Sequence, residues 1–366
     1  MRIALVVIVL LIGTPVEASA AAPPPDSTFA RLGLQVPPRA RHAVYFGVGY
    51  QPGPGLRLTG TYEYAGLPAG VLSFTGGWNE ELLGSAGYRF AYDLGTWPPQ
   101  ALQVSTELFS GFTPNRLLDD AEADERRTGG RVTLALQGDR PRGAYRLYVG
   151  GQHARIDLSA PLDAGHWLTT ADLGGEYTLA RRPLLPDALA GVRLRVGWEH
   201  PEAAFVTLRA AGRVLRPLGA GFEAVVDGQV EWASRNAPAY EQASFGGMTS
   251  VRGYRADAAV GRQLWTLQNE LWAPLPGTAR ATSGIAAALG QYARLAAFFD
   301  VGGVARTTGG LSADVRSGLG LGLRLLLGPL TLRIDWAHRT TALRDGHFRG
   351  DLYVSARSNV AALLVP

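Results

Sequence analysis

Residues 318–327 read Gly-Leu-Gly-Leu-Gly-Leu-Arg-Leu-Leu-Leu, so that leucine occupies every second position. Because successive side chains of a β-strand point to opposite faces, such a strand has one aliphatic face and one face of glycine and arginine. A transmembrane barrel wall needs this alternation, with apolar side chains toward lipid and small or polar ones toward the lumen. The stretch therefore predicts a strand of a membrane-spanning β-barrel.

The same period of two returns along the chain and predicts an all-β fold, a transmembrane antiparallel β-barrel of about sixteen strands. A soluble sandwich could alternate in the same way, but it would have to bury charged inner faces, whereas a wide barrel keeps them hydrated. The other predicted strands are Val44–Tyr50, Leu56–Thr59, Val71–Trp78, Tyr88–Tyr92, Leu102–Leu108, Val132–Leu136, Tyr145–Val149, Leu173–Tyr177, Val192–Trp198, Phe205–Val214, Phe222–Trp232, Arg262–Leu271, Leu295–Gly302, Leu330–Trp336 and Gly350–Ala356.

The first residues have the features of an export signal. Arg2 precedes an apolar run from Ile3 to Ile12, and Ala18-Ser19-Ala20 offers a small-x-small cleavage site. We expect residues 1–20 to be a signal peptide, residues 21–41 a Pro-rich periplasmic linker, and residues 42–366 the outer-membrane barrel. The predicted location is the bacterial outer membrane, where lipid and lipopolysaccharide would surround the barrel.

Composition excludes several classes of protein. After residue 21 no run of about 18 uncharged apolar residues occurs, so no transmembrane helix is predicted. The chain contains no cysteine, which excludes disulfides and thiol chemistry. Its 35 basic residues are all arginine, yet the net charge is only +4 and no clustered basic face is evident. We therefore expect no nucleic-acid partner.

The connections between the predicted strands should alternate between long external loops and short periplasmic turns. With the N-terminus on the periplasmic side, the external connections include Thr113–Arg127, Asp157–Trp167 and Ser234–Gly261. The inner ones include Gly138–Gly143, Arg216–Gly221 and Gly328–Pro329. The connection Pro274–Tyr292 is long where the scheme expects a short turn.

The longest external connection carries a motif, Gly246-Gly247-Met248-Thr249-Ser250-Val251-Arg252-Gly253-Tyr254, and the strand after next reads Phe298-Phe299-Asp300-Val301-Gly302. In this order and separation, the two resemble the Gly-Gly-x-x-x-Val-Arg-Gly-Phe/Tyr and Phe-x-Asp-x-Gly motifs of a superfamily of outer-membrane assembly and secretion barrels. That superfamily includes BamA, TamA and FhaC, and is also called bacterial surface antigen. The chain resembles a short form without the periplasmic POTRA modules.

The resemblance implies a site and a function. The loop should fold back into the barrel, and Arg252 should meet the lumen wall at Asp300. The loop-motif residues are Gly246, Gly247, Val251, Arg252, Gly253 and Tyr254, and the wall residues are Phe298, Asp300 and Gly302. Without the motifs, the residues alone favour Arg252 as one of many solvated arginines and Asp300 as an ordinary lumen carboxylate. The implied activity is protein translocation or membrane-protein insertion without chemistry, on a secreted or outer-membrane client, with a separate periplasmic partner replacing the modules.

Enzymatic and metal chemistry lack the necessary residues. Ser250 has neither a Gly-x-Ser-x-Gly setting nor an evident histidine partner. The six histidines are scattered without ligand spacing, so neither a metal nor another cofactor is expected; they are His42, His153, His166, His200, His338 and His347. Two functions stay open: a protein-translocating or protein-inserting barrel, and a passive pore or structural barrel that retains the loop as a plug.

Overall fold

The structure of the 366-residue chain is a computed structural model. It describes residues 32–33, 42–51, 55–67, 70–79, 86–97, 102–118, 121–140, 143–162, 164–179, 187–200, 203–276, 290, 292–305, 315–327, 330–341 and 350–358. The expected signal peptide and all of the expected linker except Leu32–Gly33 lie outside the described residues. Within them, no helix has the length and hydropathy required to cross a bilayer.

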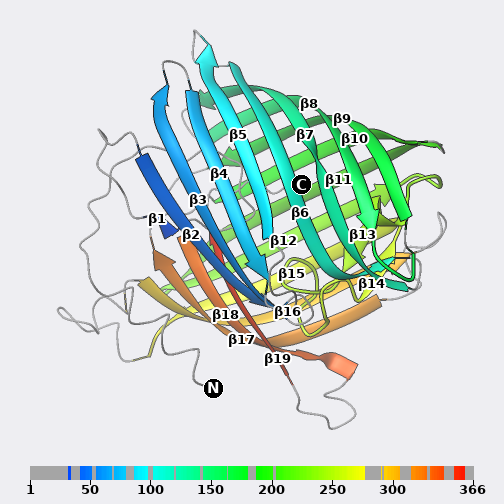
Figure 1. The fold of residues 1–366 in the computed structure, drawn as a ribbon. Coiled ribbons are helices and arrows are strands. Elements are labelled where there is room, and N and C mark those ends of the chain that lie inside the picture. The colour runs from blue at the N-terminus through cyan, green and yellow to red at the C-terminus, as the bar shows by residue number, and fades with distance from the viewer. Residues whose placement is uncertain are drawn as a thin grey trace.

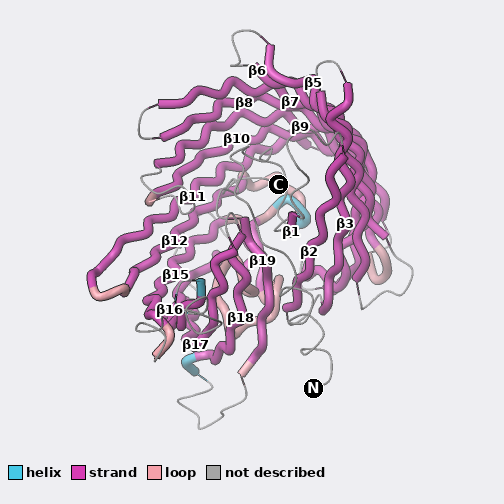
Figure 2. Tube along the Cα trace, turned by 90° about the vertical axis from the view of Figure 1, so that its left-hand side faces the viewer, coloured by secondary structure: helices cyan, strands magenta, loops and turns pink. Residues whose placement is uncertain are grey.

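The chain folds into one large antiparallel sheet whose strands tilt around a central space (Figures 1 and 2). A second, two-stranded sheet lies within the loop that joins β12 to β15. The strands are β1 (Leu32–Gly33), β2 (His42–Gln51), β3 (Gly55–Leu67), β4 (Gly70–Asn79), β5 (Ala86–Trp97), β6 (Leu102–Leu118), β7 (Ala121–Arg140), β8 (Gly143–Leu158), β9 (Ala164–Leu179), β10 (Ala188–His200), β11 (Ala203–Gly219), β12 (Phe222–Ala233), β13 (Ala243–Phe245), β14 (Ala259–Gly261), β15 (Gln263–Pro274), β16 (Ala293–Ala305), β17 (Val315–Leu327), β18 (Leu330–Arg339) and β19 (Asp351–Ser358).

The large sheet contains seventeen strands, of which β1 lies beside β2 while the other sixteen follow one another around the wall. β9 pairs with β10, and the last strand, β19, pairs with β2, so these sixteen strands close on themselves. The predicted all-β barrel and its approximate strand number are confirmed. From β2 through β18 to β19, ladders of eight or more residue pairs join neighbouring strands, which pairs backbone groups within the wall as a strand in hydrocarbon requires.

The closing contact between β19 and β2, here called the seam, is short. It consists of the pairs Val354↔Tyr50 and Ser355↔Gly49. On its other side β19 pairs with β18 over eight residue pairs, and β2 pairs with β3 over ten. Because ladder length sets how many backbone hydrogen bonds join two strands, the seam is the weakest of these three contacts.

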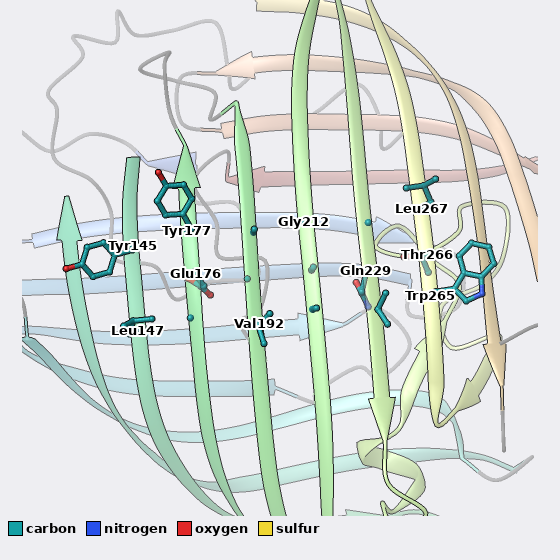
Figure 3. Close-up of a pocket in the computed structure, with 17 residues that line it drawn as sticks. Tyr145, Leu147, Glu176, Tyr177, Val192, Gly212, Gln229, Trp265, Thr266 and Leu267 are labelled. Atoms are coloured by element: carbon teal, nitrogen blue, oxygen red, sulfur yellow. The ribbon is translucent and has the colours of Figure 1, made fainter. Parts of the chain in front are cut away.

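The outer face of the wall is apolar, with aromatic residues near both rims. Trp167, Trp198, Trp232 and Trp336 are exposed near the strand ends that face the β12–β15 loop, and Tyr177, Phe222 and Tyr292 near the opposite ends. Amphipathic rings are typical of the two membrane interfaces. A groove of about 910 Å³ crosses this outer face from β8 to β15 between such residues, including Tyr145, Tyr177 and Trp265 (Figure 3).

Two of the predicted external loops are wrong in extent. Thr113–Arg127 was expected to be a connection, but β6 and β7 continue their ladder through it, with Thr113 opposite Glu125 and Leu118 opposite Ala121. Asp157–Trp167 is similarly shortened, because Leu158 pairs with Ala164. Beyond the membrane both faces of a hairpin are hydrated, so the strand continues although the apolar alternation stops. The predicted connection Ser234–Gly261 agrees with the observed break between β12 and β15.

Candidate functional site

The loop between β12 and β15 makes a tight reversal at its tip. Gly246, Gly247 and Gly253 have φ angles of 107°, 80° and 91°, which favour glycine because it has no Cβ. The Gly247 N–H donates to the Tyr254 carbonyl at 2.9 Å, and the Gly246 N–H donates to the Ser250 hydroxyl at 3.2 Å. These bonds close the motif on itself and leave Arg252 projecting from it.

Arg252 is fully buried and reaches the inner wall at Asp300 on β16. Its Nε donates to Asp300 Oδ2 and its Nη2 to Asp300 Oδ1, both at 2.7 Å, while its backbone N–H donates to Oδ2 at 3.1 Å. This is the bidentate arrangement in which a guanidinium best matches a carboxylate. Phe299, the neighbour of Asp300 in sequence, is exposed on the outer face, so Asp300 faces the lumen.

Two further carboxylates complete the surroundings of Arg252. Its Nη1 donates to Glu270 Oε1 on β15 at 2.7 Å and to Asp335 Oδ2 on β18 at 2.9 Å. Arg324 and Arg333 bond to the same two carboxylates. The loop arginine thus enters a buried cluster of three arginines and three acids, in which each charge has at least one opposite charge beside it. A buried charge is tolerated only when it is paired and hydrogen-bonded in this way.

Close packing surrounds the ionic cluster. The Arg252 guanidinium carbon lies 3.6 Å from the centre of the Phe298 ring, a cation–π contact. Tyr254 packs edge-to-face on Phe245 at 5.6 Å. A Cβ at Gly302 would stand 3.1 Å from the Val251 side chain, and one at Gly318 would overlap the Arg252 carbonyl. Glycine on the wall strands therefore lets the loop motif approach the wall backbone closely.

The structure places each residue of the expected site as follows. Val251 and Arg252 lie against β16, Gly253 and Tyr254 lie against β18 and β19, and Phe298, Asp300 and Gly302 line the wall beneath them. Gly246 and Gly247 form the reversal, and their backbone N–H groups donate to Ser250 and Tyr254 within the loop. The sequence did not predict a role in this site for Glu270, Asp335, Arg324 or Arg333. The period of two could assign these residues to the lumen face. It could not show that they lie at the level along the barrel axis where Arg252 contacts the wall.

A second set of contacts holds the beginning of the loop against a different part of the wall. The short 3-10 helix η1 (Ala239–Glu241) directs the Glu241 carboxylate between two wall arginines. Arg127 on β7 donates to Glu241 Oε1 at 2.8 Å, and Arg195 on β10 donates to Oε2 at 2.9 Å. The Tyr240 hydroxyl donates to Glu199 on β10 at 2.7 Å. We call these contacts of Tyr240 and Glu241 the η1 anchor.

Electrostatics stabilise the η1 anchor. Burial alone would raise the pKa of Glu241, but the positive charges of Arg127 and Arg195 outweigh it and lower the pKa to about 2. Burial, followed by the hydrogen bond to Glu199, raises the pKa of the Tyr240 hydroxyl. Glu241 is therefore ionised, and Tyr240 neutral, throughout the physiological pH range.

The described residues contain no group of three or more histidine, aspartate or glutamate side chains arranged to hold a metal ion. Ser250 is buried, and its hydroxyl accepts the Gly246 N–H. That bond gives the serine a structural role in the loop tip. The interaction that this site shows is ion pairing between a loop and a wall.

The comparisons with known proteins agree with the fold. Residues 192–348, which contain the loop and its wall partners, match the Omp85 superfamily domain. No curated protein sequence is significantly similar to the chain.

Many solved structures match the chain, and three of them illustrate the shared architecture. BamA from Haemophilus ducreyi lacking POTRA domains 1–3 has a TM-score of 0.63 at 16% identity over 87% of this chain and 70% of that one. CdiB from Escherichia coli has 0.59 at 14% identity, over 88% and 63%. CdiB from Acinetobacter baumannii has 0.56 at 13%, over 87% and 59%. The chain thus spans less than two thirds of either CdiB chain, and at these identities the likeness concerns the fold.

Proposed function

We propose, from the premise that this chain carries an Omp85 superfamily domain and lies in the bacterial outer membrane, that it moves protein clients across or into that membrane without covalent chemistry. The client would be a secreted protein or another outer-membrane protein, and a separate periplasmic partner would deliver it. Lipid and lipopolysaccharide surround the wall. In this proposal the loop motif, residues 246–254, and the wall residues Phe298, Asp300 and Gly302 form the control element rather than a catalytic centre.

The observation that carries the proposal is the buried ionic cluster around Arg252. A loop that served only as a passive cover could be held by apolar packing, since replacing a buried ion pair by apolar residues is often neutral or stabilising. Ion pairs have directional geometry and specify one seated position, and they can exchange partners when the loop moves. The cluster therefore suits a loop with more than one functional position.

The η1 anchor favours a second candidate, a passive pore or structural barrel in which the loop is a fixed plug. The loop is held at Arg252 by β15, β16 and β18, and at Glu241 by β7 and β10. Two anchors on separate parts of the wall restrict the movement of the loop. A plug that never leaves its seat would need this restriction.

Reconstitution in liposomes separates the two candidates. The purified protein is expected to accelerate the membrane insertion of a small outer-membrane barrel protein added from urea, relative to empty liposomes. The Arg252→Ala variant should fold but lose the acceleration, and Gly151→Ala, on the outer face of β8 with nothing closer than 3.8 Å to the new Cβ, should retain it. A steady ion conductance without any acceleration of insertion would instead establish the passive pore.

A further inference from the structure

Tyr353 lies one residue from the seam and faces the loop motif. It belongs to β19, is fully buried, and pairs with Asp335 of β18. The next residue, Val354, pairs with Tyr50 of β2 across the seam. Because side chains alternate along a strand, Tyr353 points into the lumen while Val354 points to the outer face. A lumen-facing residue, Tyr353, is therefore the immediate sequence neighbour of a residue that pairs across the seam, Val354.

The Tyr353 hydroxyl bonds to the motif in both directions. It accepts the Gly253 N–H at 3.0 Å and donates to the Tyr254 carbonyl at 2.9 Å. Its ring packs in a buried cluster with Met248 of the loop and with Phe298 and Ala337 of the wall. All of these bonds go to loop backbone, so they depend on where the loop lies and not on which side chains it carries.

The neighbouring strand is tied to the same part of the loop. Arg339 on β18 donates from its Nε to the Gly253 carbonyl at 2.7 Å, and Asp335 accepts from Arg252 at 2.9 Å. A Cβ at Gly253 would stand 2.8 Å from the His338 carbonyl carbon, so the two backbones approach as closely as glycine permits. The motif therefore contacts the last two strands of the barrel, on the β19 side of the seam.

We propose that Tyr353 is a positioning residue that couples the seat of the loop to the closure of the seam. With the loop seated, the two hydroxyl bonds hold β19 in the register that brings Val354 and Ser355 opposite Tyr50 and Gly49. When the loop leaves, β19 keeps its eight pairs with β18 but loses its luminal support, and the two-pair seam opens. The inference rests on the proposed function, since it states how a moving loop would act on the wall.

Hydrogen exchange at the seam tests the coupling in the full-length protein in liposomes, because the exchange rate of a paired amide follows the open population. Tyr353→Phe keeps the ring and removes both hydroxyl bonds. We expect amide exchange in residues 353–356 and 48–50 to become about tenfold faster, which corresponds to about 1.4 kcal/mol. Tyr148→Phe, a tyrosine of β8 on the opposite side of the ring, is the matched control and should leave the seam unchanged.

Two additional variants distinguish coupling from a general loosening of β19. Arg252→Ala should accelerate seam exchange as well, and the double variant should be no faster than the faster single one, since both changes remove one connection. Equal exchange in Tyr353→Phe and wild type, or additive effects in the double variant, would overturn the proposal. Because the chain has no cysteine, Tyr50→Cys with Val354→Cys can be oxidised selectively, and this lock should restore slow exchange in Tyr353→Phe.

The exchange measurement requires no client protein. Coupling without any acceleration of client insertion would therefore leave the inference standing and the proposed function refuted. Client insertion with unchanged seam exchange would do the reverse.

Discussion

The ionic cluster predicts an unequal effect of removing its two principal partners. In Arg252→Ala, Glu270 and Asp335 keep their bonds to Arg324 and Arg333, but Asp300 loses all three bonds that it receives from Arg252. A fully buried carboxylate is then left without its cation, and breaking a buried pair in this way costs about 3–5 kcal/mol. In Asp300→Ala, Arg252 still has Glu270 and Asp335, so we expect a smaller loss of about 2 kcal/mol.

The double variant Arg252→Ala with Asp300→Ala provides the sharper test. It removes the orphaned acid, so it should be more stable than Arg252→Ala alone by about 1–3 kcal/mol, the cost of leaving a buried polar group unsatisfied. The measurements are the temperature at which the unheated barrel loses its anomalous gel mobility and the protease resistance of residues 234–261. If Arg252→Ala were no worse than Asp300→Ala, or if the double variant were the least stable of the three, the reasoning would be refuted.

The structure also argues against a simple charge exchange at this pair. An exchange of Arg252 and Asp300 would be expected to restore part of the pairing if the two residues stood alone. Here it would place an acid at position 252 between Glu270 and Asp335. Like charges at that distance in a buried site repel strongly, so the exchanged variant should be less stable than either alanine variant.

Three other outcomes follow from the loop geometry. The Glu241 pKa of about 2 lies below the ordinary 4.5, so the stabilisation that Glu241 contributes is full above about pH 4.5 and is lost as pH falls toward 2. Acidification should therefore lower the amide protection factors of residues 237–242, taken as exchange relative to the intrinsic amide rate at each pH, and in Glu241→Gln these protection factors should be low at either pH. Gly253→Ala, with φ of 91° and a backbone clash at His338, should release the loop to protease, whereas Gly151→Ala should not. Gly318→Ala should act like Gly253→Ala because its Cβ would overlap the Arg252 carbonyl, and an unchanged digestion pattern would contradict the described packing.

The sequence was informative where one face of the chain meets lipid. All sixteen wall strands carry a period-two segment, because hydrocarbon imposes an apolar side chain at every second position. The outer part of the β6–β7 hairpin has no such constraint, so the sequence predicted a loop at Thr113–Arg127 although β6 and β7 continue their ladder there. The roles of Glu270 and Asp335 as partners of Arg252 could not be predicted for a different reason. Their meeting with Arg252 depends on the stagger of strands around the ring, which a single strand's pattern does not encode.

The η1 anchor was equally invisible to sequence reasoning. Glu241 lies in a polar loop, and its partners Arg127 and Arg195 are far away in the chain, on β7 and β10. No local spacing connects these three residues. The motif around Arg252 was found only because it resembles the motif of a known superfamily.

The loop between β12 and β15 leaves and re-enters the wall at neighbouring positions, since Trp232 pairs with Gln263. The ladder between these two strands already holds the ends of the loop together. Docking the loop inside the barrel therefore has no additional entropic cost of loop closure. The wall strands can therefore pair before the loop docks, so that the two steps are separate during folding. A nascent barrel would pass through a stage that is complete in its hydrogen-bonded wall and still open in its interior.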